Sequence, residues 1–373
     1  MALILNEQQT MMRESAFAFV AENAPVSHLR QLRDTHDETG FSRGFWKRCA
    51  DMGFCGVMIP EEHGGMELGN VEAGIIMEAF GHTLAPTPML SSSVLATVAL
   101  REAGTEAQQA QWLPRIASGE AVVALAVDES SRHRPDKLDA RVRQERDYLR
   151  LDGDKIAVID GHVADALIVA ARDLDNKPAL FLVDPKQKGV EIERTIMVDS
   201  HNAARIRFED VRVAPDALLS GGNGARALGC ALDAGRAMLS AEMVGIADEV
   251  FARTVAYLQE RKQFGQFIGE FQALQHRASH LYCEIEFTRA AVAQALSRLD
   301  EDPAGAAEDV SIAKARAGAT CTLAVQEAVQ MHGGIGMTDE LDIGLFMKRA
   351  RVCQELFGDD NFHIDYIGVL RGY

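Results

Sequence analysis

The feature that most constrains the fold is a change in the spacing of apolar residues, which occurs twice along the chain. Up to about residue 120, apolar side chains recur every three to four residues, as on one face of an α-helix. From Ala121 they form short β-rich runs between Gly, Asp and Pro turns. After Pro215 the helical spacing returns. The pattern predicts an α+β protein with domains at residues 1–120, 121–220 and 221–373.

The N-terminal domain, residues 1–120, is expected to be helical. Asn6 is placed to cap its first helix, because a short polar side chain there can accept a bond from a free backbone N–H. Further helices are predicted over Gly44–Met52, Val71–Phe80 and Glu106–Ser118. Gly81 is the expected end of the third of these, since glycine commonly terminates helices.

The central domain, residues 121–220, is expected to be a small antiparallel β-sheet or barrel. Its β-rich runs are not separated by helices, and parallel βαβ units would need such helices. Asp152-Gly153 is typical of a hairpin turn between two strands. The six runs are 121–127, 148–153, 155–161, 166–172, 179–184 and 204–213.

The C-terminal domain, residues 221–373, is predicted to be a bundle of the four-helix type. A helix starting near Phe271 carries one apolar stripe, and Asp302-Pro303 ends it. The Ala-rich helix Val310–Met331 follows, and Gly333-Gly334 ends that one. The stripe consists of Leu274, Ala278, Leu281, Ile285, Thr288, Val292, Ala295 and Leu299.

Charge and cysteine content limit the partners and the compartment. The chain has 38 Lys and Arg against 55 Asp and Glu, a formal net charge of −17. This acidity argues against nucleic acid or an anionic membrane as the main partner. The six cysteines form no CxxC pair, and neither a leader nor an apolar run long enough to span a membrane is present. We therefore expect a cytoplasmic protein with no membrane span.

Four motifs, in this order of domains, resemble the acyl-CoA dehydrogenase family. Two are its C-terminal signatures, RKQFGQFIGEFQALQHR at Arg261–Arg277 and QMHGGIGMTDE at Gln330–Glu340. The others are PEEHGG near residue 60 and FEDVRVAPDALL at Phe208–Leu219. The likeness covers nearly the whole chain and implies the α–β–α arrangement of that family.

The resemblance also implies an activity and its partners. Members carry FAD and desaturate acyl-CoA thioesters at the α–β bond. A carboxylate removes the α-proton while a hydride passes to the flavin, and the electrons leave to an electron-transfer flavoprotein. The thioester carbonyl must be polarised by hydrogen bonds, because its α-proton is a weak acid. The active form is expected to be a dimer or tetramer.

By the resemblance, one subunit contributes side chains to the FAD of a neighbouring subunit. An arginine suits a pyrophosphate because its planar donors pair with two oxygens, and glycines admit a nucleotide close to the backbone. The alternatives are a solvated helix-end arginine and an ordinary helix C-cap. The matching residues are Arg261, Phe264, Gln272, Gln330, Gly333 and Gly334.

The parts of the family pattern that hold a subunit's own flavin are altered. The usual TEPxAGSD-like loop is replaced by DESSRHRP at residues 128–135, which has no glycine. The usual Trp-Ile-Thr strand behind the flavin corresponds to Ala157-Val158-Ile159. The ring wall and a hydroxyl donor are therefore both missing.

The family's catalytic glutamate is missing from both of its known positions. One corresponds to Phe357 and the other to Gly235, directly before Arg236. Neither side chain can accept a proton. The resemblance still assigns substrate binding to Arg236 and to the main-chain N–H of Phe357, the atom that bonds the thioester carbonyl in this family.

Two carboxylates are candidates for a substitute base. Glu242 lies two helical turns after Gly235, and its alternative role is a polar group at a bundle or subunit interface. Asp359, followed by Asp360, comes just after the Phe357 position, and its alternative role is a helix N-cap. His363 could complete a metal site with these acids, but one histidine and two carboxylates are a weak metal signature, so we predict no metal.

Two hypotheses from different classes follow, with a third on the same fold. The chain is either a self-sufficient flavoenzyme using Asp359 or Glu242, or the base-lacking subunit of a heteromeric enzyme with a paralogue. The second is favoured because the contacts to a neighbour's FAD persist while the base and flavin loop are lost. The resemblance implies this as well, because some family members of steroid-degrading bacteria assemble in such pairs, which would suit fatty acid or steroid side-chain degradation. A flavin oxidase or monooxygenase is the third reading.

Overall fold

The computed structural model describes residues 4–146 and 148–373 and divides the chain into two compact units. The helical unit comprises residues 4–34, Asn70–Ala85 and Arg236–Tyr373, and the sheet unit comprises Thr35–Gly69 and Pro86–Gly235. Each unit joins segments that are distant in sequence, whereas the predicted domain boundaries follow the order of elements along the chain. Helices, then a sheet, then a helical bundle are found in that order, so the predicted α+β fold class is confirmed.

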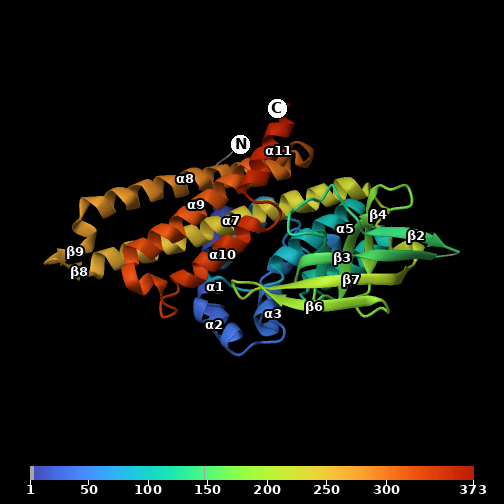
Figure 1. The fold of residues 1–373 in the computed structure, drawn as a ribbon, viewed down its shortest axis with the longest axis horizontal. Helices are drawn as coiled ribbons and strands as arrows, with labels where there is room; N and C mark the ends of the chain where they lie inside the picture. The colour runs from blue at the N-terminus through green and yellow to red at the C-terminus, as the bar shows by residue number, and fades with distance from the viewer. Residues whose placement is uncertain (1–3, 147) are drawn as a thin grey trace. The chain divides into compact units, whose positions relative to one another are not determined.

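Most of the helical unit is a set of long helices, of which α8, α9 and α10 run beside one another in Figure 1. The long helix α7 (Gly224–Glu260) begins in the sheet unit and continues into the helical unit from Arg236. A short hairpin follows it, made of β8 (Lys262–Gln263) and β9 (Gln266–Phe267). The other helices of this unit are α1 (Glu7–Asn23), α2 (Val26–Asp34), α4 (Asn70–Thr83), α8 (Gln272–Glu301), α9 (Ala307–His332), α10 (Ile343–Glu355) and α11 (Asp360–Leu370).

Local sequence signals explain where two of these helices begin and which face they bury. The side chain of Asn6 accepts a bond from the N–H of Gln9, and the Gln9 side chain returns one, which forms the predicted cap of α1. In α8 the predicted stripe is buried from Leu281 through Thr288 to Leu299, so the apolar spacing identifies the packed face correctly.

Glycine has a different role in α4 from the one expected. Gly81 does not end the helix, which continues to Thr83. A Cβ at Gly81 would lie 2.2 Å from the main-chain oxygen of Glu242, and one at Gly245 would lie 2.0 Å from that of Glu78. The two glycines therefore let α4 and α7 touch backbone to backbone, and this contact, rather than helix termination, accounts for Gly81.

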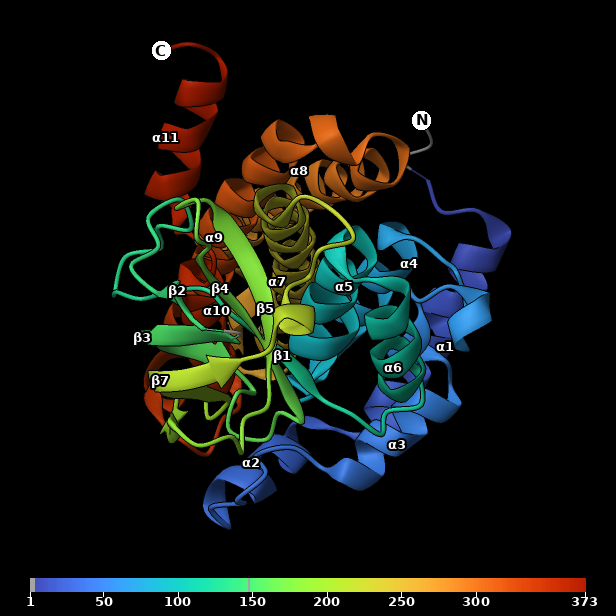
Figure 2. The same cartoon turned by 90° about the vertical axis from the view of Figure 1, so that its right-hand side faces the viewer.

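The sheet unit is built around one seven-stranded sheet. Figure 2 shows α5 and α6 beside β1, the strand that contacts the π-helical segment η3 (Met89–Ala96). The helices are α3 (Arg43–Asp51), α5 (Thr97–Ala103) and α6 (Glu106–Ala117). The strands are β1 (Val123–Ala126), β2 (Arg141–Glu145), β3 (Tyr148–Ile159), β4 (Ala166–Arg172), β5 (Pro178–Val183), β6 (Val190–Ile196) and β7 (Asn202–Val213).

The sheet has the order β1-β4-β2-β3-β7-β6, with β5 also paired to β4. Antiparallel pairing holds as predicted for β2–β3, β3–β7, β4–β5 and β6–β7. β4 instead runs parallel to both β1 and β2, so the sheet is mixed. The β2–β3 hairpin separates β1 from β4 along the chain, which leaves enough intervening chain for a parallel return without a crossover helix.

The predicted hairpin turn at Asp152-Gly153 is wrong. β3 runs unbroken from Tyr148 to Ile159, and Gly153, with φ +148°, lies at a register shift in its pairing with β7. The dipeptide therefore forms a β-bulge, which tolerates glycine for the same conformational reason as a turn. Among the described residues, none of the helices combines the length and hydrophobicity that a membrane crossing requires.

Candidate functional site

The turn between α10 and α11 holds Phe357, the predicted position of the missing base. Leu356 leaves α10, and Phe357 and Gly358 both have positive φ angles, +59° and +108°. Left-handed backbone is unfavourable for a phenylalanine, so neighbouring groups must hold it. The Phe357 residue is only 6% exposed. The position of the acid is therefore occupied by a buried aromatic side chain in a constrained turn.

Two buried cations bond the carbonyls of this turn. Arg236 donates from Nε to the main-chain oxygen of Phe357 at 3.0 Å, and its guanidinium lies over the ring of Phe362. Lys314 of α9 donates from Nζ to the main-chain oxygens of Gln354 at 2.8 Å and Gly358 at 3.1 Å. Burial lowers the pKa of Lys314 to about 8. Sequence reasoning selected Arg236 and Phe357 but missed Lys314.

Glu242, one candidate base, forms a buried ion pair. Its two carboxylate oxygens accept from Nε and Nη2 of Arg349 at 2.6 and 2.9 Å, and its residue is 3% exposed. A bidentate guanidinium stabilises the charged carboxylate and occupies both oxygens. This geometry favours the packing role of Glu242 over proton abstraction.

The other candidate, Asp359, begins α11. Its Oδ1 accepts from the N–H of Phe362 at 2.8 Å, which is the N-cap arrangement weighed as its alternative role. Asp360 accepts from the amide of Gln354, and burial raises the pKa of this carboxyl group. His363 is fully buried, with Nδ1 3.2 Å from the hydroxyl of Ser311. In the described residues, no group of three or more His, Cys, Asp or Glu is arranged to hold a metal ion.

The residues predicted to contact a neighbour's FAD gather at one end of the helical unit. Tyr257, one turn before Arg261, stacks on His332 with ring centroids 4.4 Å apart. His332 directly precedes Gly333 and Gly334, so this contact brings the two family motifs together. Both the β8–β9 hairpin and the end of α9 lie at the left in Figure 1.

The residues predicted to contact FAD are exposed to solvent. Arg261 is exposed, and no carboxylate in residues 4–146 or 148–373 lies within ion-pair distance of it. Phe264 is 91% exposed, and a Cβ added at Gly333 or Gly334 would meet nothing within 4 Å. Gln272 and Gln330 are exposed too. An arginine, an aromatic ring and open glycine backbone at one surface are a donor set that fits a dinucleotide approaching from outside this unit.

The loop at residues 128–135 of the sheet unit, where the family pattern has its flavin loop, makes contacts within this unit. In the altered loop at residues 128–135, His133 Nδ1 lies 2.7 Å from a carboxylate oxygen of Asp128. Glu129 bonds the buried amine of Lys155 at 2.7 Å and also accepts from the N–H of Ala140. Ala157, where the family has its tryptophan wall, is exposed with φ +51°. Polar side chains of the loop are therefore engaged within the loop and with Lys155 and Ala140, and this set does not fit a flavin as the outer set fits a dinucleotide.

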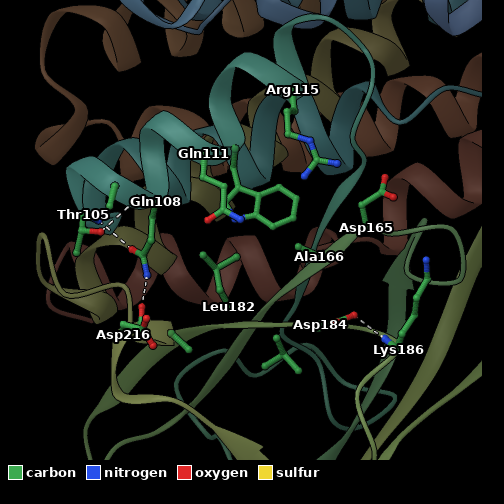
Figure 3. Close-up of a pocket in the computed structure, with 14 residues that line it drawn as sticks. Thr105, Gln108, Gln111, Arg115, Asp165, Ala166, Leu182, Asp184, Lys186 and Asp216 are labelled. Carbon is green, nitrogen blue, oxygen red and sulfur yellow. Dashed lines mark hydrogen bonds between the residues drawn. The ribbon is translucent and has the colours of Figure 1, made fainter.

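Two surface hollows lie elsewhere. One of about 610 Å³ in the sheet unit is lined by α6 and the ends of β4 and β5, with Arg115, Asp165 and Lys186 around it (Figure 3). Gln108 inside it is already bonded to the main-chain oxygen of Asp216. The other, about 690 Å³ in the helical unit, lies among α1, α4, α7 and α8. Neither is lined by any predicted site residue.

Comparison with known proteins identifies relatives along almost the whole chain. The acyl-CoA dehydrogenase N-terminal domain matches residues 6–120, and the C-terminal domain of the same family matches residues 222–369. Acyl-CoA dehydrogenase FadE12 of Mycobacterium tuberculosis is 29% identical, over 95% of this chain and 93% of its own length.

Two solved structures of two-chain proteins share the fold. A chain of the ChsE4–ChsE5 complex from Mycobacterium tuberculosis is 26% identical, with a TM-score of 0.89 over 100% of both chains. A variant of the Tcur3481–Tcur3483 steroid ACAD is 28% identical, with a TM-score of 0.89 over 98% of each chain. These findings confirm the predicted family, its FAD cofactor and its reaction class. The chain belongs to the acyl-CoA dehydrogenase family, whose FAD-dependent members oxidise CH–CH bonds.

Proposed function

We propose that this chain is the base-lacking subunit of a heteromeric acyl-CoA dehydrogenase that desaturates an acyl-CoA thioester at its α–β bond. One observation carries the proposal. Arg261 and Phe264 are exposed, and Arg261 has no ion-pair partner among the described residues, whereas the base position holds the buried Phe357. A paralogous subunit would supply the carboxylate and the intact flavin loop.

The outer residues would hold the FAD of that paralogue. Arg261 would pair with its pyrophosphate, Phe264 would cover an apolar part, and Gln330 with Gly333 and Gly334 would border the adenosine side. Gln272, exposed on the first turn of α8, belongs to the same set. FAD supplies the hydride acceptor, and an electron-transfer flavoprotein is the proposed next acceptor.

The chain's own turn would still bind a thioester without removing a proton. Arg236 fixes the Phe357 carbonyl, and the adjacent main-chain N–H of Phe357 is the proposed donor to the thioester oxygen. Backbone donors suit a developing oxyanion because they are pre-oriented. The two-chain structural neighbours support an assembly of this kind, and the steroid ACAD supports a bulky or branched acyl group. We place the assembly in the cytoplasm.

The self-sufficient alternative keeps one specific observation in its favour. Asp359 is only half-buried and lies two residues after Phe357, so its second carboxylate oxygen remains available beside the turn. Glu242 has no comparable oxygen, because Arg349 engages both. Asp359→Asn and Glu242→Gln should therefore be compared by exchange of the acyl-CoA α-proton with deuterium. A selective loss in Asp359→Asn would favour the alternative.

The direct test compares the chain alone with the chain co-expressed with a paralogue encoded nearby that carries the glutamate and the TEP loop. We expect the chain alone to be nearly colourless and inactive, and the mixed assembly to be yellow and to reduce its flavin with acyl-CoA. A bright yellow homo-oligomer that is reduced by acyl-CoA would contradict the proposal.

A point variant sharpens this test. Arg261→Ala should weaken FAD binding by the mixed assembly roughly 10- to 100-fold, because it removes a charge-assisted hydrogen bond to the dinucleotide. Arg207→Ala, which removes an exposed arginine on β7, is the matched control. Equal flavin retention by the two variants would argue against the outer site.

A further inference from the structure

The turn that carries Phe357 is fastened by a lysine that the proposed function does not use. Lys314 lies on α9, is 1% exposed, and extends its amine to α10 and to the turn beyond it. Among the described residues, its amine has two hydrogen-bond acceptors, the main-chain oxygens of Gln354 and Gly358. A lysine buried without an ion-pair partner is rare, because burial disfavours its charge.

The position of these two acceptors gives the lysine its structural effect. Gln354 belongs to the last turn of α10, where carbonyls have no partner within the helix. Gly358 lies on the far side of Phe357. One amine therefore ties the end of the helix to the residue after the left-handed phenylalanine. With Arg236 on the carbonyl of Phe357 itself, three carbonyls within five residues are each held by a buried side chain.

The two acceptors would satisfy the amine even in its uncharged form. A neutral amine has two N–H groups, and two carbonyls receive them, whereas an ammonium would need a third acceptor. The titratable groups that face Lys314 are Cys353 and Glu355 from α10, Asp360 and His363 from α11, and Arg236 from α7. Among the described residues no carboxylate lies within ion-pair distance of Lys314.

We propose that Lys314 is a positioning residue of the acyl-CoA site, whose amine holds the α10–α11 turn and thereby sets the direction of the Phe357 main-chain N–H. The inference rests on the proposed function for the identity of the ligand that this N–H meets. That Lys314 holds the turn is independent of any ligand. The two parts therefore need separate measurements.

The first measurement is amide hydrogen exchange, followed by mass spectrometry, on the full chain without ligand. Lys314→Met keeps the length and packing of the side chain but removes both donors. We expect exchange in the peptide that covers residues 354–361 to become about tenfold faster or more, while α8 stays protected. Lys348→Met, on α10, is the matched control and should leave this peptide unchanged. An unchanged turn, or equally faster exchange in α8, would overturn the positioning role.

If Lys314→Met does not fold, Lys314→Gln is the second variant. Its amide keeps two N–H donors on a shorter side chain, so it can reach one of the two carbonyls at most. Amide exchange in the 354–361 peptide should then be faster than in the wild type, but by less than the roughly tenfold expected when both bonds are lost. A fully protected turn in Lys314→Gln would contradict the need for both bonds.

The second measurement compares octanoyl-CoA with S-octyl-CoA, the thioether that lacks the carbonyl oxygen. The wild type should prefer the thioester about five- to tenfold, and Lys314→Met should lose that preference while binding the thioether unchanged. Equal losses for both ligands would point to a merely structural lysine and overturn the proposal. If the wild type itself shows no preference, the thioester assignment of the proposed function fails, and the exchange measurement still decides whether Lys314 holds the turn.

Discussion

Two of the cations that the helical unit buries, Arg349 and Lys314, are satisfied by different kinds of partner. Arg349 is paired with the carboxylate of Glu242 through two parallel hydrogen bonds. Within the described part of the chain, the amine of Lys314 bonds only main-chain carbonyls, at 2.8 and 3.1 Å. Both side chains are buried, so solvent cannot compensate either charge. The difference lies in the partner, which is a full negative charge in one case and neutral dipoles in the other.

Arg349 and Lys314 should differ in whether they change their charge with pH. A guanidinium keeps its proton throughout the accessible pH range, so Arg349 itself does not change its charge. The amine of Lys314 has lost the stabilisation that water gives its charge, and it can release its proton without losing either hydrogen bond. The Arg349–Glu242 pair joins α10 to α7 through two charged groups. The Lys314 amine can instead lose its charge while it keeps both hydrogen bonds.

Breaking the Arg349 pair should have the largest effect. Arg349→Met leaves Glu242 buried without a partner, and we expect a loss of about 3–5 kcal/mol in the free energy of unfolding. Denaturant titration measures it. The double variant Glu242→Leu, Arg349→Met should recover most of this loss, because two apolar side chains need no partners. A single variant that costs less than about 1 kcal/mol would show that the carboxylate finds another partner or becomes protonated.

The Lys314 contact should make the free energy of unfolding depend on pH. In the unfolded chain this amine keeps its proton up to its ordinary pKa of 10.5, whereas in the fold it releases it near 8. Between these values the unfolded state binds more protons, so the free energy of unfolding must rise with pH. The wild type should gain roughly 3 kcal/mol over Lys314→Met across this window.

The comparison between variants removes other titrations from this measurement. Burial raises the pKa of the Cys49 thiol to about 12, so this thiol destabilises the fold at high pH in both proteins and cancels in the difference. A parallel slope for Lys314→Met and the wild type would mean that Lys314 stays charged in the fold.

The smallest effect is expected at the start of α11, where Asp359 caps the helix and no buried cation is involved. Asp359→Ala removes the acceptor for the N–H of Phe362 and should cost about 1 kcal/mol in the free energy of unfolding. Asp359→Asn, which retains an acceptor, should cost almost nothing. Thermal unfolding distinguishes the two. If both variants lose stability equally, the charge near the start of α11, rather than the cap, is what matters.

The elements that follow from the sequence are those governed by neighbours along the chain. The stripe from Leu281 to Leu299 and the Asn6 cap depend only on spacing and on local hydrogen bonds. Gly81 and Gly153 were misjudged for a common reason. Glycine marks a place where the backbone needs freedom, but the sequence does not say whether a turn, a bulge or a second helix demands it.

The site divides in the same manner. The exposed residues assigned to FAD follow from the family resemblance, and their contact with FAD stays a prediction. Lys314 could not be found because a lysine in an Ala-rich helix ordinarily reads as a solvent-facing residue. Its partners lie 40 and 44 residues further on, and both are carbonyls, which every residue type supplies. Only the packing of α9 against α10 and α11 identifies them.

The backbone contact between α4 and α7 has one more consequence. Gly81 lies against the carbonyl of Glu242, and Gly245 lies against that of Glu78. At these two positions the helices approach each other without an intervening side chain. Mutational tolerance should therefore be lowest at two residues that carry no side chain at all. Even an alanine at either position would bring a methyl group within 2.2 Å of a backbone oxygen of the facing helix, so a survey that scores only charged and polar residues would overlook this contact.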